Sequence, residues 1–301
     1  MRDERIGEIF ILGQVAIFGF FPIIASDISR LMPPVLFMAI STLIAAVCTG
    51  VYLLWKREFK GLANPRALIY MLGAALFIAT IPQIFIILGA SKTSSINVAI
   101  LWQTEMLFTF IICGGFYDDH VTLRKVLAAM FIVIGATAVL YNGSFHINLG
   151  DLFIIAGTFF FPFGNIFTKK AFPLSTPSVI LFVRSMIGGV ALLAFSLAFE
   201  KYDHSIINYT QLHLAPLLIN GIIISFISKL IWYRGLVHLE ITKAIALTLS
   251  GPGFTLIYAF ALNHEVPTMY QLAGLVVIIA GLFVLIQKSA LPRSVPPPYA
   301  V

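Results

Sequence analysis

Two long apolar segments of the chain align with each other without a gap. They are Gly89–Leu140 and Gly235–Ile286, and the offset between them is 146 residues throughout (235 − 89 = 146). Related residue types coincide at Gly89 and Gly235, Phe108 and Phe254, Asp119 and Glu265, Leu127 and Ala273, and Gly135 and Gly281. Two copies of an apolar unit are typical of membrane carriers, in which two halves rock around a site between them.

The composition excludes an ordinary soluble domain. Hydrophobic residues make up 59% of the 301 residues, charged residues only 11%, and the mean hydropathy is +0.98. A soluble domain carries about 25% charged residues, so this chain has too few charges to cover a surface that faces water. Cys48 and Cys113 lie inside apolar runs, where we expect small core residues rather than a disulfide or a metal site.

Ten apolar runs are long enough to cross a membrane, since about 20 helical residues span about 30 Å of hydrocarbon. Their predicted bounds are 6–29, 34–55, 66–89, 93–116, 122–142, 149–170, 176–199, 212–235, 241–263 and 267–288. Backbone groups find no water inside a bilayer, so runs this apolar and this long must be helices. The predicted fold class is an all-α membrane protein with ten transmembrane helices.

The distribution of Lys and Arg predicts the orientation. Of the 19 Lys and Arg residues, Arg184 and Lys229 fall inside spans, while Arg30, Lys92 and Lys201 lie on the side opposite the termini. The other fourteen (19 − 2 − 3 = 14) lie on the side that holds both termini. Cytosolic loops are rich in Lys and Arg, so we expect a multi-pass protein of the cell membrane with both termini in the cytosol. The formal charge of +6 reflects this bias and does not indicate nucleic-acid binding.

The predicted repeat is inverted. Each half holds five spans, an odd number, so equivalent helices cross the membrane in opposite directions. The first spans align at a slightly different offset, which places Pro22 over Pro162 (162 − 22 = 140). We expect a first five-helix unit at residues 1–145, a second at 146–290, and a disordered Pro-rich tail at 291–301.

The second copy carries a family pattern in Ala244, Pro252, Glu265, Gln271, Gly274 and Gly281. With these residues it resembles the EamA-type repeat of the drug/metabolite transporter superfamily, and the resemblance covers nearly the whole chain as two units. The first copy departs from the pattern, with Met106 in place of Pro and Asp119 in place of Glu. The resemblance implies a carrier of small metabolites, often an exporter, with a central cavity among the first, third, fourth, sixth, eighth and ninth helices.

Glu105 is an acidic residue near the middle of the fourth predicted span. A charge at this depth costs at least about 2.5 to 3.5 kcal/mol on insertion scales, so it usually faces a cavity or a partner. One interpretation is a group that binds a proton or contacts a cation. The alternative is a structural ion pair that joins two helices.

Two basic residues also fall inside predicted spans. Lys229, five residues before Arg234, can hold an anionic group of a substrate, or it can extend to the cytosolic headgroups. Its repeat equivalent is the polar Gln83 (229 − 83 = 146), which favours a cavity. We interpret Arg184 as a structural intramembrane charge, because Arg is suited to fixed contacts with carboxylates or carbonyls.

The triplet Gly251, Pro252 and Gly253 interrupts the ninth predicted span. Proline removes a backbone hydrogen bond, so the triplet can free carbonyl groups for a substrate site. The alternative is a kink that serves helix packing only. Trp102, Gln14 and Asn165 are further candidates for the cavity wall, although such residues often serve only contacts between helices.

The sequence thus predicts a secondary transporter that exports a small polar or amphipathic metabolite, such as an amino acid, by alternating access. Proton coupling is a hypothesis that rests on Glu105. The alternatives are a channel-like pathway and, less favoured, a membrane-embedded enzyme acting on lipid, for which no nucleophile or metal cluster is found. We expect no cofactor and no metal. The expected partners are a small-molecule substrate, the bilayer and protons, with no nucleic acid, in a monomer or a homodimer.

Overall fold

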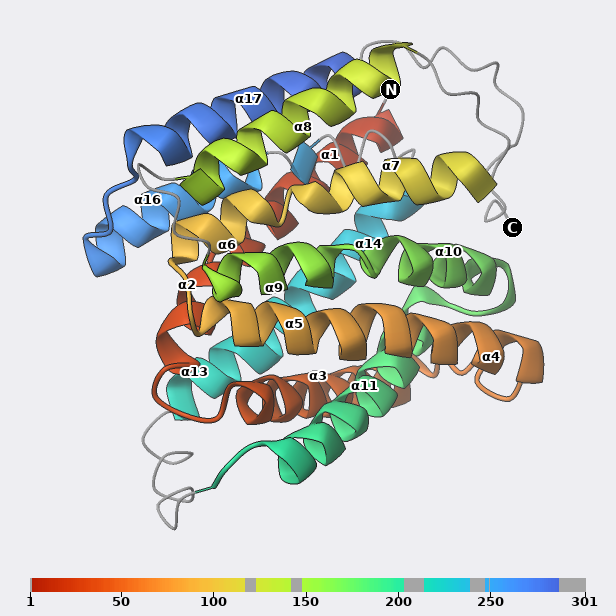
Figure 1. The fold of residues 1–301 in the computed structure, drawn as a ribbon. Coiled ribbons are helices and arrows are strands. Elements are labelled where there is room, and N and C mark those ends of the chain that lie inside the picture. The colour runs from red at the N-terminus through yellow and green to blue at the C-terminus, as the bar shows by residue number, and fades with distance from the viewer. Residues whose placement is uncertain are drawn as a thin grey trace.

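The computed structural model describes residues 2–116, 123–141, 148–202, 214–238, 247–248 and 250–286. Every regular element among these residues is a helix, as expected for the all-α class (Figure 1). Asp119 and the predicted tail at 291–301 lie outside the described residues.

The first part of the chain forms nine helical elements up to residue 141. They are α1 (Arg2–Phe18), α2 (Phe21–Ile28), α3 (Pro34–Lys56), α4 (Pro65–Ala74), the π-helix η1 (Ala75–Thr80), α5 (Ile81–Ala90), α6 (Ser95–Leu101), α7 (Thr104–Phe116) and α8 (Leu123–Tyr141). The described elements after residue 148 are α9 (Leu149–Thr158), α10 (Phe161–Ala171), the 3-10 helix η2 (Phe172–Leu174), α11 (Pro177–Phe199), α13 (Leu214–Leu218), the π-helix η3 (Ile219–Ser228), α14 (Lys229–His238), α16 (Gly251–Asn263) and α17 (Met269–Ile286).

Six described segments are long and apolar enough to cross a membrane. They are Arg5–Ile28, Pro34–Lys56, Pro65–Ala90, Leu149–Leu174, Pro177–Phe199 and Leu214–Gly235. They coincide with the first, second, third, sixth, seventh and eighth predicted spans. Shorter apolar stretches lie in α8, at Met130–Val139, and in α17, at Met269–Gly281.

Large apolar side chains are exposed along these helices, as expected for a surface in contact with lipid. Trp55 and Phe199 are each 74% exposed, and Leu54, Leu197 and Val276 are also exposed. In water such a continuous apolar surface would promote aggregation, whereas lipid tails cover it at no cost. The chain is therefore a multi-pass membrane protein.

Polar residues at the turns set where several helices begin. The Asn64 side chain accepts hydrogen bonds from the backbone N–H groups of Arg66 (3.0 Å) and Ala67 (3.4 Å) and so caps α4. Helix α3 is capped by a residue far along the chain, because the Glu200 carboxylate accepts from the N–H groups of Val35 (2.8 Å) and Leu36 (2.9 Å). The first N–H groups of a helix have no partner within it, so these acceptors stabilise the helix starts.

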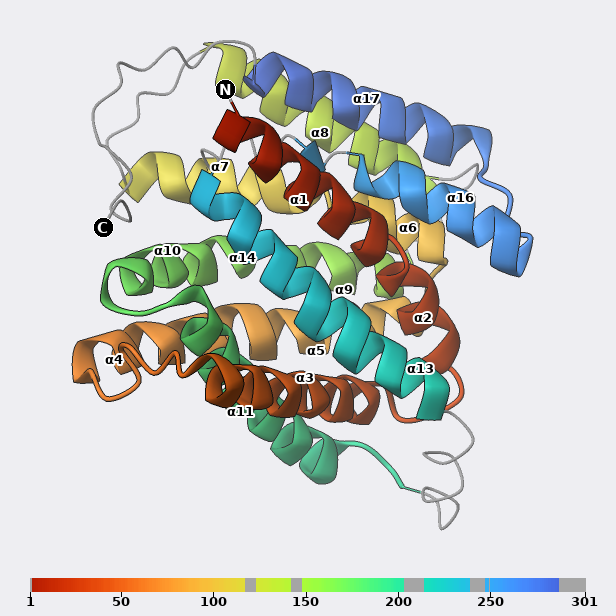
Figure 2. The same cartoon turned by 180° about the vertical axis from the view of Figure 1, so that it is seen from behind.

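The closest helix contacts join elements that are far apart in the chain. Helix α8 packs along α17, α3 along α11, α5 along α9, and α1 along α14 (Figures 1 and 2). Glycine permits the closest approach in the first of these pairs. A Cβ atom on Gly135 would lie 2.6 Å from the carbonyl oxygen of Gly274, and a Cβ atom on Gly274 would lie 2.6 Å from that of Gly135. Any larger residue at either position would push the two backbones apart.

Helix interruptions occur at matching positions of the predicted repeat. Helix α1 gives way to α2 at Gly19–Phe20, and α9 gives way to α10 at Phe159–Phe160, which is the same place at the 140-residue offset (19 + 140 = 159). The π-helix η1 corresponds to part of η3 at the 146-residue offset (75 + 146 = 221). Pro22, Pro82 and Pro162 lie in the first turns of α2, α5 and α10, where the missing proline N–H is tolerated.

The fourth predicted span is also divided, rather than one continuous helix. Helix α6 ends at Leu101 and α7 begins at Thr104. The equivalent start in the second copy is α16 at Gly251, one residue from the aligned position (104 + 146 = 250). Pro252 lies in the first turn of α16, so the triplet of the sequence analysis marks a helix start.

Candidate functional site

Glu105 lies in the first turn of α7, directly after the interruption that separates α7 from α6. Its Oε2 atom accepts a hydrogen bond from the indole Nε1 of Trp102 at 3.0 Å. Its Oε1 atom accepts from the Nδ2 group of Asn165, on α10, at 3.4 Å. The structure thus brings together three residues that the sequence analysis selected separately. Asn165 is exposed and Glu105 is partly exposed, so this group borders open space.

Trp102 is surrounded by aromatic rings. Phe18 and Phe21 contact it edge-on, with centroid distances of 5.4 and 5.6 Å, and Phe161 stacks on it at 5.5 Å. Such ring pairs contribute about 0.5–1.5 kcal/mol each beyond the burial of their area. The indole is therefore held in one orientation, with its N–H group directed at Glu105.

Lys229 is the first residue of α14 and directly follows the π-helix η3. Its Nζ atom lies 4.0 Å from the centroid of the Phe18 ring, which is a cation–π contact. The charges of Lys229 and Glu105 interact electrostatically, but no direct ion pair joins the two side chains. Since Phe18 also contacts Trp102, which donates to Glu105, the two aromatic rings link the basic residue to the acidic one.

Arg184, on α11, is 8% exposed and interacts electrostatically with Lys229. Its Nη1 group donates to the hydroxyl of Tyr233 at 3.1 Å, and its guanidinium carbon lies 5.8 Å from the centroid of that ring. Its Nε group has no hydrogen-bond partner among the described residues. The contact with Tyr233 joins α11 to α14, which agrees with a structural role, but it leaves one donor of the guanidinium unused.

Tyr233 is a residue of this site that sequence reasoning missed. Its position at the end of a span favours an anchor at the membrane interface, yet the side chain is only 3% exposed. It follows Lys229 by four residues on the same helix, so both lie on one face of α14. This spacing was the signal that could have linked Tyr233 to the site.

Gln14, on α1, is 4% exposed and lies against η3. Its Nε2 group donates to the hydroxyl of Ser228 at 3.2 Å, next to Lys229 in the chain. Its Oε1 atom is buried without a hydrogen-bond partner among the described residues. An unpaired buried acceptor is costly, so this atom is a candidate for a contact with a ligand or water.

Two other candidates are Gln83 and the triplet at the start of α16. Gln83 donates through Nε2 to the carbonyl of Ile78 at 3.2 Å, within the interrupted turn before its own helix. A Cβ atom on Gly253 would have no atom within 4 Å, so the start of α16 faces open space there. Thr255, in the next turn, donates to the carbonyl of Gly19 at 2.9 Å. Helix α16 therefore supplies a hydrogen-bond donor to a backbone carbonyl at the interruption after α1.

A second buried polar group lies near the other end of the helices, and sequence reasoning did not identify it as a group. Asp151, near the start of α9, is 3% exposed and accepts hydrogen bonds from the Thr93 hydroxyl and from Asn97 Nδ2 (3.1 Å). Gln271 Nε2 in turn donates to Asn97 Oδ1 at 2.6 Å. We call these four residues the α9 polar network. Its sequence signals were Gln271, which belongs to the family pattern, and a lone carboxylate just inside the sixth apolar run.

Comparison with known proteins places the chain among transporters. The EamA-like transporter family matches it twice, at residues 5–141 and 148–287. A Salmonella typhimurium protein named "Probable amino-acid metabolite efflux pump" is 31% identical over 196 residues, which cover 62% of this chain and 65% of that protein. The Bacillus subtilis "Uncharacterized transporter YyaM" is 27% identical over 203 residues, which cover 64% of this chain and 65% of that protein. These two alignments thus span slightly less than two thirds of each relative.

Other matches cover nearly the whole chain. An "Uncharacterized transporter" of Methanothermobacter thermautotrophicus is 24% identical over 306 residues, with 93% of this chain and 85% of that protein covered. A crystal structure with 12% sequence identity superposes with a TM-score of 0.67 over 93% of this chain and 96% of its own, so the fold is shared. With both halves matched by the same family, the chain belongs to the EamA-like transporter family.

Proposed function

We propose that this protein is a secondary transporter that exports a small polar or amphipathic metabolite, such as an amino acid, by alternating access. The observation that carries the proposal is the match between helix interruptions in the two copies, beside which lie Glu105 and Lys229, linked through Trp102 and Phe18. In membrane carriers, interrupted helices leave backbone and charged groups free for a substrate at mid-membrane. The coarser conclusion, that the chain is a transporter, rests on its family.

In this proposal the chain forms ten spans, as two inverted five-helix units at residues 1–145 and 146–290. The distant helix pairs support the inversion, because α3 with α11 and α8 with α17 are the second with the seventh and the fifth with the tenth predicted spans. A twofold relation between two inverted units brings equivalent helices side by side in this way.

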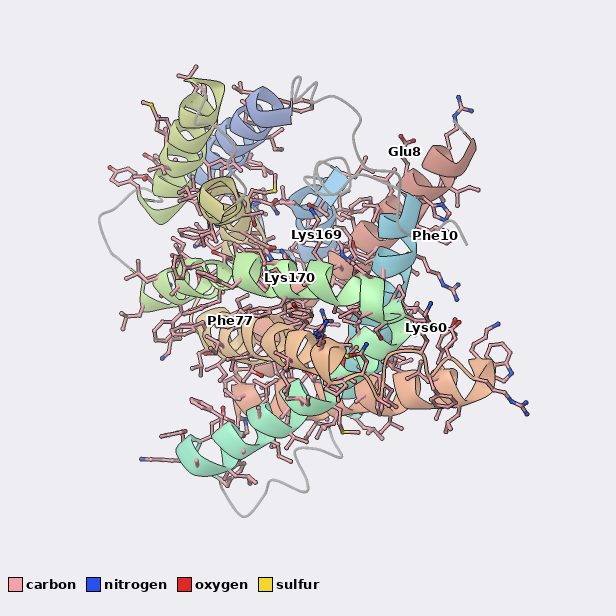
Figure 3. The ribbon with its side chains drawn as sticks, turned by 90° about the vertical axis from the view of Figure 1, so that its right-hand side faces the viewer. Glu8, Phe10, Lys60, Phe77, Lys169 and Lys170 are labelled. Atoms are coloured by element: carbon pink, nitrogen blue, oxygen red, sulfur yellow. The ribbon has the colours of Figure 1, made fainter. Side chains whose placement is uncertain are left out.

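The proposed orientation has both termini in the cytosol of a cell membrane. The ends of α3 and α10 and the start of α4, which carry Lys56, Lys169, Lys170 and Arg66, all lie on the right-hand side of Figure 1. Figure 3 views the molecule from that side and labels Lys60, Lys169 and Lys170. A cluster of basic residues at one end is typical of the cytosolic face.

Site-directed cysteine labelling tests this orientation. A cysteine at Lys201, on the opposite side in the predicted topology, should react with an impermeant reagent applied to intact cells, in a background free of Cys48 and Cys113. A cysteine at Lys60 should be protected until the membrane is opened. The reverse labelling pattern would invert the proposal.

Alternating access requires contacts that close one end and break during transport. The α9 polar network joins α6 of the first unit to α9 and α17 of the second. Close to it, Ser95 donates to Glu265 at 2.6 Å, and Asn263 donates to both carboxylate oxygens of Asp27 at 3.1 and 2.9 Å. These contacts all cross between the two units, and the helices α2, α6 and α16 that carry them meet at the left of Figure 1, at the opposite end from α4. In the proposal they close the external end of the pathway.

Proton coupling is proposed through Glu105. Glu105 is partly exposed, and its carboxylate is held by two uncharged donors, with Lys229 nearby but not paired to it. A carboxylate in such a position can bind a proton when the pathway opens, since no fixed cation holds it ionised. The α6–α7 interruption beside it provides a flexible point for the required movement.

The experiment that tests the function is counterflow in proteoliposomes. Vesicles loaded with a single unlabelled amino acid, screened over the twenty standard ones, should accumulate the same labelled amino acid transiently above its external concentration. Flux should saturate with concentration. A channel would instead give linear flux without counterflow, and that result would overturn the carrier mechanism.

A further inference from the structure

We infer that Arg184 and Lys229 together form an anion subsite that binds the carboxylate group of the transported substrate. The inference deepens the proposed function and assigns to Arg184 a direct contact with substrate, in addition to its contact with Tyr233. Three features of the site support this subsite: its basic side chains outnumber its acidic ones, some of its N–H donors have no hydrogen-bond partner, and Tyr233 holds Arg184 beside the face of α14 that carries Lys229.

The charge balance of the site is positive. Among the described residues that interact electrostatically around Lys229, Arg184 and Lys229 are basic and Glu105 alone is acidic. Burying basic side chains inside a membrane protein removes much of their hydration. One carboxylate faces two basic side chains, so the site can accept a further negative charge. A bound anion would supply it.

Glu105 is also not positioned to neutralise either cation directly. Both of its carboxylate oxygens are already engaged, one by Trp102 and the other by Asn165. Phe18 lies between this group and Lys229, with its ring in contact with both Trp102 and the ammonium group. The acidic and basic parts of the site are therefore held apart, as a substrate with separate amino and carboxylate groups requires.

Both cations have donors left over. Arg184 is more than nine-tenths buried, yet its Nε group has no hydrogen-bond partner among the described residues. Lys229 makes only the contact with the Phe18 ring and no hydrogen bond to a described residue. Arginine and lysine donors that lack a partner bind carboxylates through short, charge-assisted hydrogen bonds.

The fold places these donors on the same side. Lys229 and Tyr233 are one turn apart on α14, and Tyr233 accepts the hydrogen bond from Arg184 Nη1. Tyr233 thus fixes the guanidinium of α11 beside the helix face that carries the ammonium group. A carboxylate placed there can accept from Lys229 and from Arg184 Nε together. The substrate class follows as a compound with a carboxylate group.

The test measures binding of three matched probes to the purified protein in detergent. The probes are L-leucine, L-leucinamide, which lacks the carboxylate charge, and 4-methylpentanoate, which lacks the amino group. The wild-type protein should bind leucine and 4-methylpentanoate, and leucinamide more weakly. Arg184→Gln and Lys229→Gln should each weaken the two carboxylate probes about tenfold, the effect of losing one charge-assisted hydrogen bond, and leave leucinamide within about twofold.

Matched controls separate this effect from general loss of charge or of folding. Arg66→Gln and Lys60→Gln remove the same charges from exposed positions and should leave all three affinities unchanged. Arg184→Lys keeps the charge and should retain part of the preference for carboxylate. The ratio of leucine to leucinamide affinity is read from folded protein only, so a lower yield of a variant does not affect it.

Two results would overturn the subsite. One is a wild-type protein that binds leucinamide as tightly as leucine or binds no carboxylate probe, and the other is an Arg184→Gln or Lys229→Gln variant that weakens all three probes equally. Failure of the proposed function looks different. Leucine that binds through these cations but is never exchanged across proteoliposomes leaves the subsite standing and removes the transport role.

Discussion

The group formed by Gln14, Glu105, Arg184 and Lys229, here called the central site, and the α9 polar network both place polar side chains among apolar helices, but they differ in how completely their hydrogen-bonding groups are satisfied. In the network, Asp151 accepts from Thr93 and Asn97, and the Asn97 amide oxygen accepts from Gln271. In the central site, Gln14 Oε1 and Arg184 Nε have no partner among the described residues, and Lys229 has only an aromatic ring. A network whose hydrogen-bonding groups are all paired holds helices together, whereas unpaired donors and charges are available to bind a ligand.

This comparison predicts the largest loss of stability in the network. Asn97→Leu removes one donor to Asp151 and the acceptor for Gln271, and so leaves the buried carboxylate with Thr93 alone and the Gln271 amide without its shortest hydrogen bond. We expect the free energy of unfolding to fall by about 3 kcal/mol. Thermal unfolding of the purified protein in detergent measures it.

The matched control is Thr137→Val, at an exposed position on α8 where the hydroxyl donates only to the carbonyl of Val133 within the same helix. That variant should unfold within about 0.5 kcal/mol of the wild type. A loss for Asn97→Leu no larger than for Thr137→Val would show that the network contributes nothing to stability.

A double-mutant cycle compares the coupling in the two regions. Asn97 and Asp151 share hydrogen bonds, so we expect their interaction energy to exceed about 1 kcal/mol. Glu105 and Lys229 form no direct pair, so Glu105→Gln with Lys229→Gln should give less than about 1 kcal/mol. Strong coupling between Glu105 and Lys229 would instead indicate a structural ion pair.

Glu105→Gln should separate folding from transport. Glutamine keeps the shape of the side chain and can still accept from Trp102, so thermal stability should change little. If Glu105 carries the coupled proton, transport by the variant should no longer depend on pH, because the neutral amide does not titrate. Proteoliposome flux at two pH values decides this, with Arg184 and Lys229 intact as the other charges of the site. A variant that keeps the wild-type pH response would remove Glu105 from the coupling.

Within the central site, a small effect on stability is expected at Gln14. Gln14→Leu loses the hydrogen bond to Ser228 but also removes the unpaired Oε1 atom, and the two effects offset each other. We expect a change below about 1 kcal/mol in the thermal unfolding assay. A loss as large as that of Asn97→Leu would show that the central site is as well satisfied as the network.

Much of the fold follows from local sequence. Six predicted apolar spans coincide with described helices to within a few residues, because length and hydropathy alone decide whether a helix can cross a membrane. Pro22 and Pro162 mark where α2 and α10 begin, since a proline has no N–H to continue the preceding helix. The fourth span carries no proline at its interruption, and there local sequence predicted one continuous helix.

The members of the site were partly visible in the sequence, because charges inside an apolar run are conspicuous. Glu105, Lys229 and Arg184 were selected in this way, and the structure relates all three through electrostatic interactions. Gln83 was selected by symmetry, and its amide donates to the carbonyl of Ile78 in the preceding π-helix η1, because an offset in the chain does not fix the rotation of a helix. Asp151 was overlooked because it lies at the start of a span, where charges are common.

The sequence by itself determined the class of protein, the helices and their repetition, because hydropathy, proline and the 146-residue offset are local or periodic properties of the chain. Only the tertiary structure decided which side chains contact one another. It placed Asn165 and Trp102 on Glu105, Tyr233 on Arg184, and Asn97 on Asp151. Such contacts depend on the relative rotation and depth of helices that lie far apart in the chain. Those are set by the packing of whole faces, such as the close approach of Gly135 and Gly274, and not by any single segment.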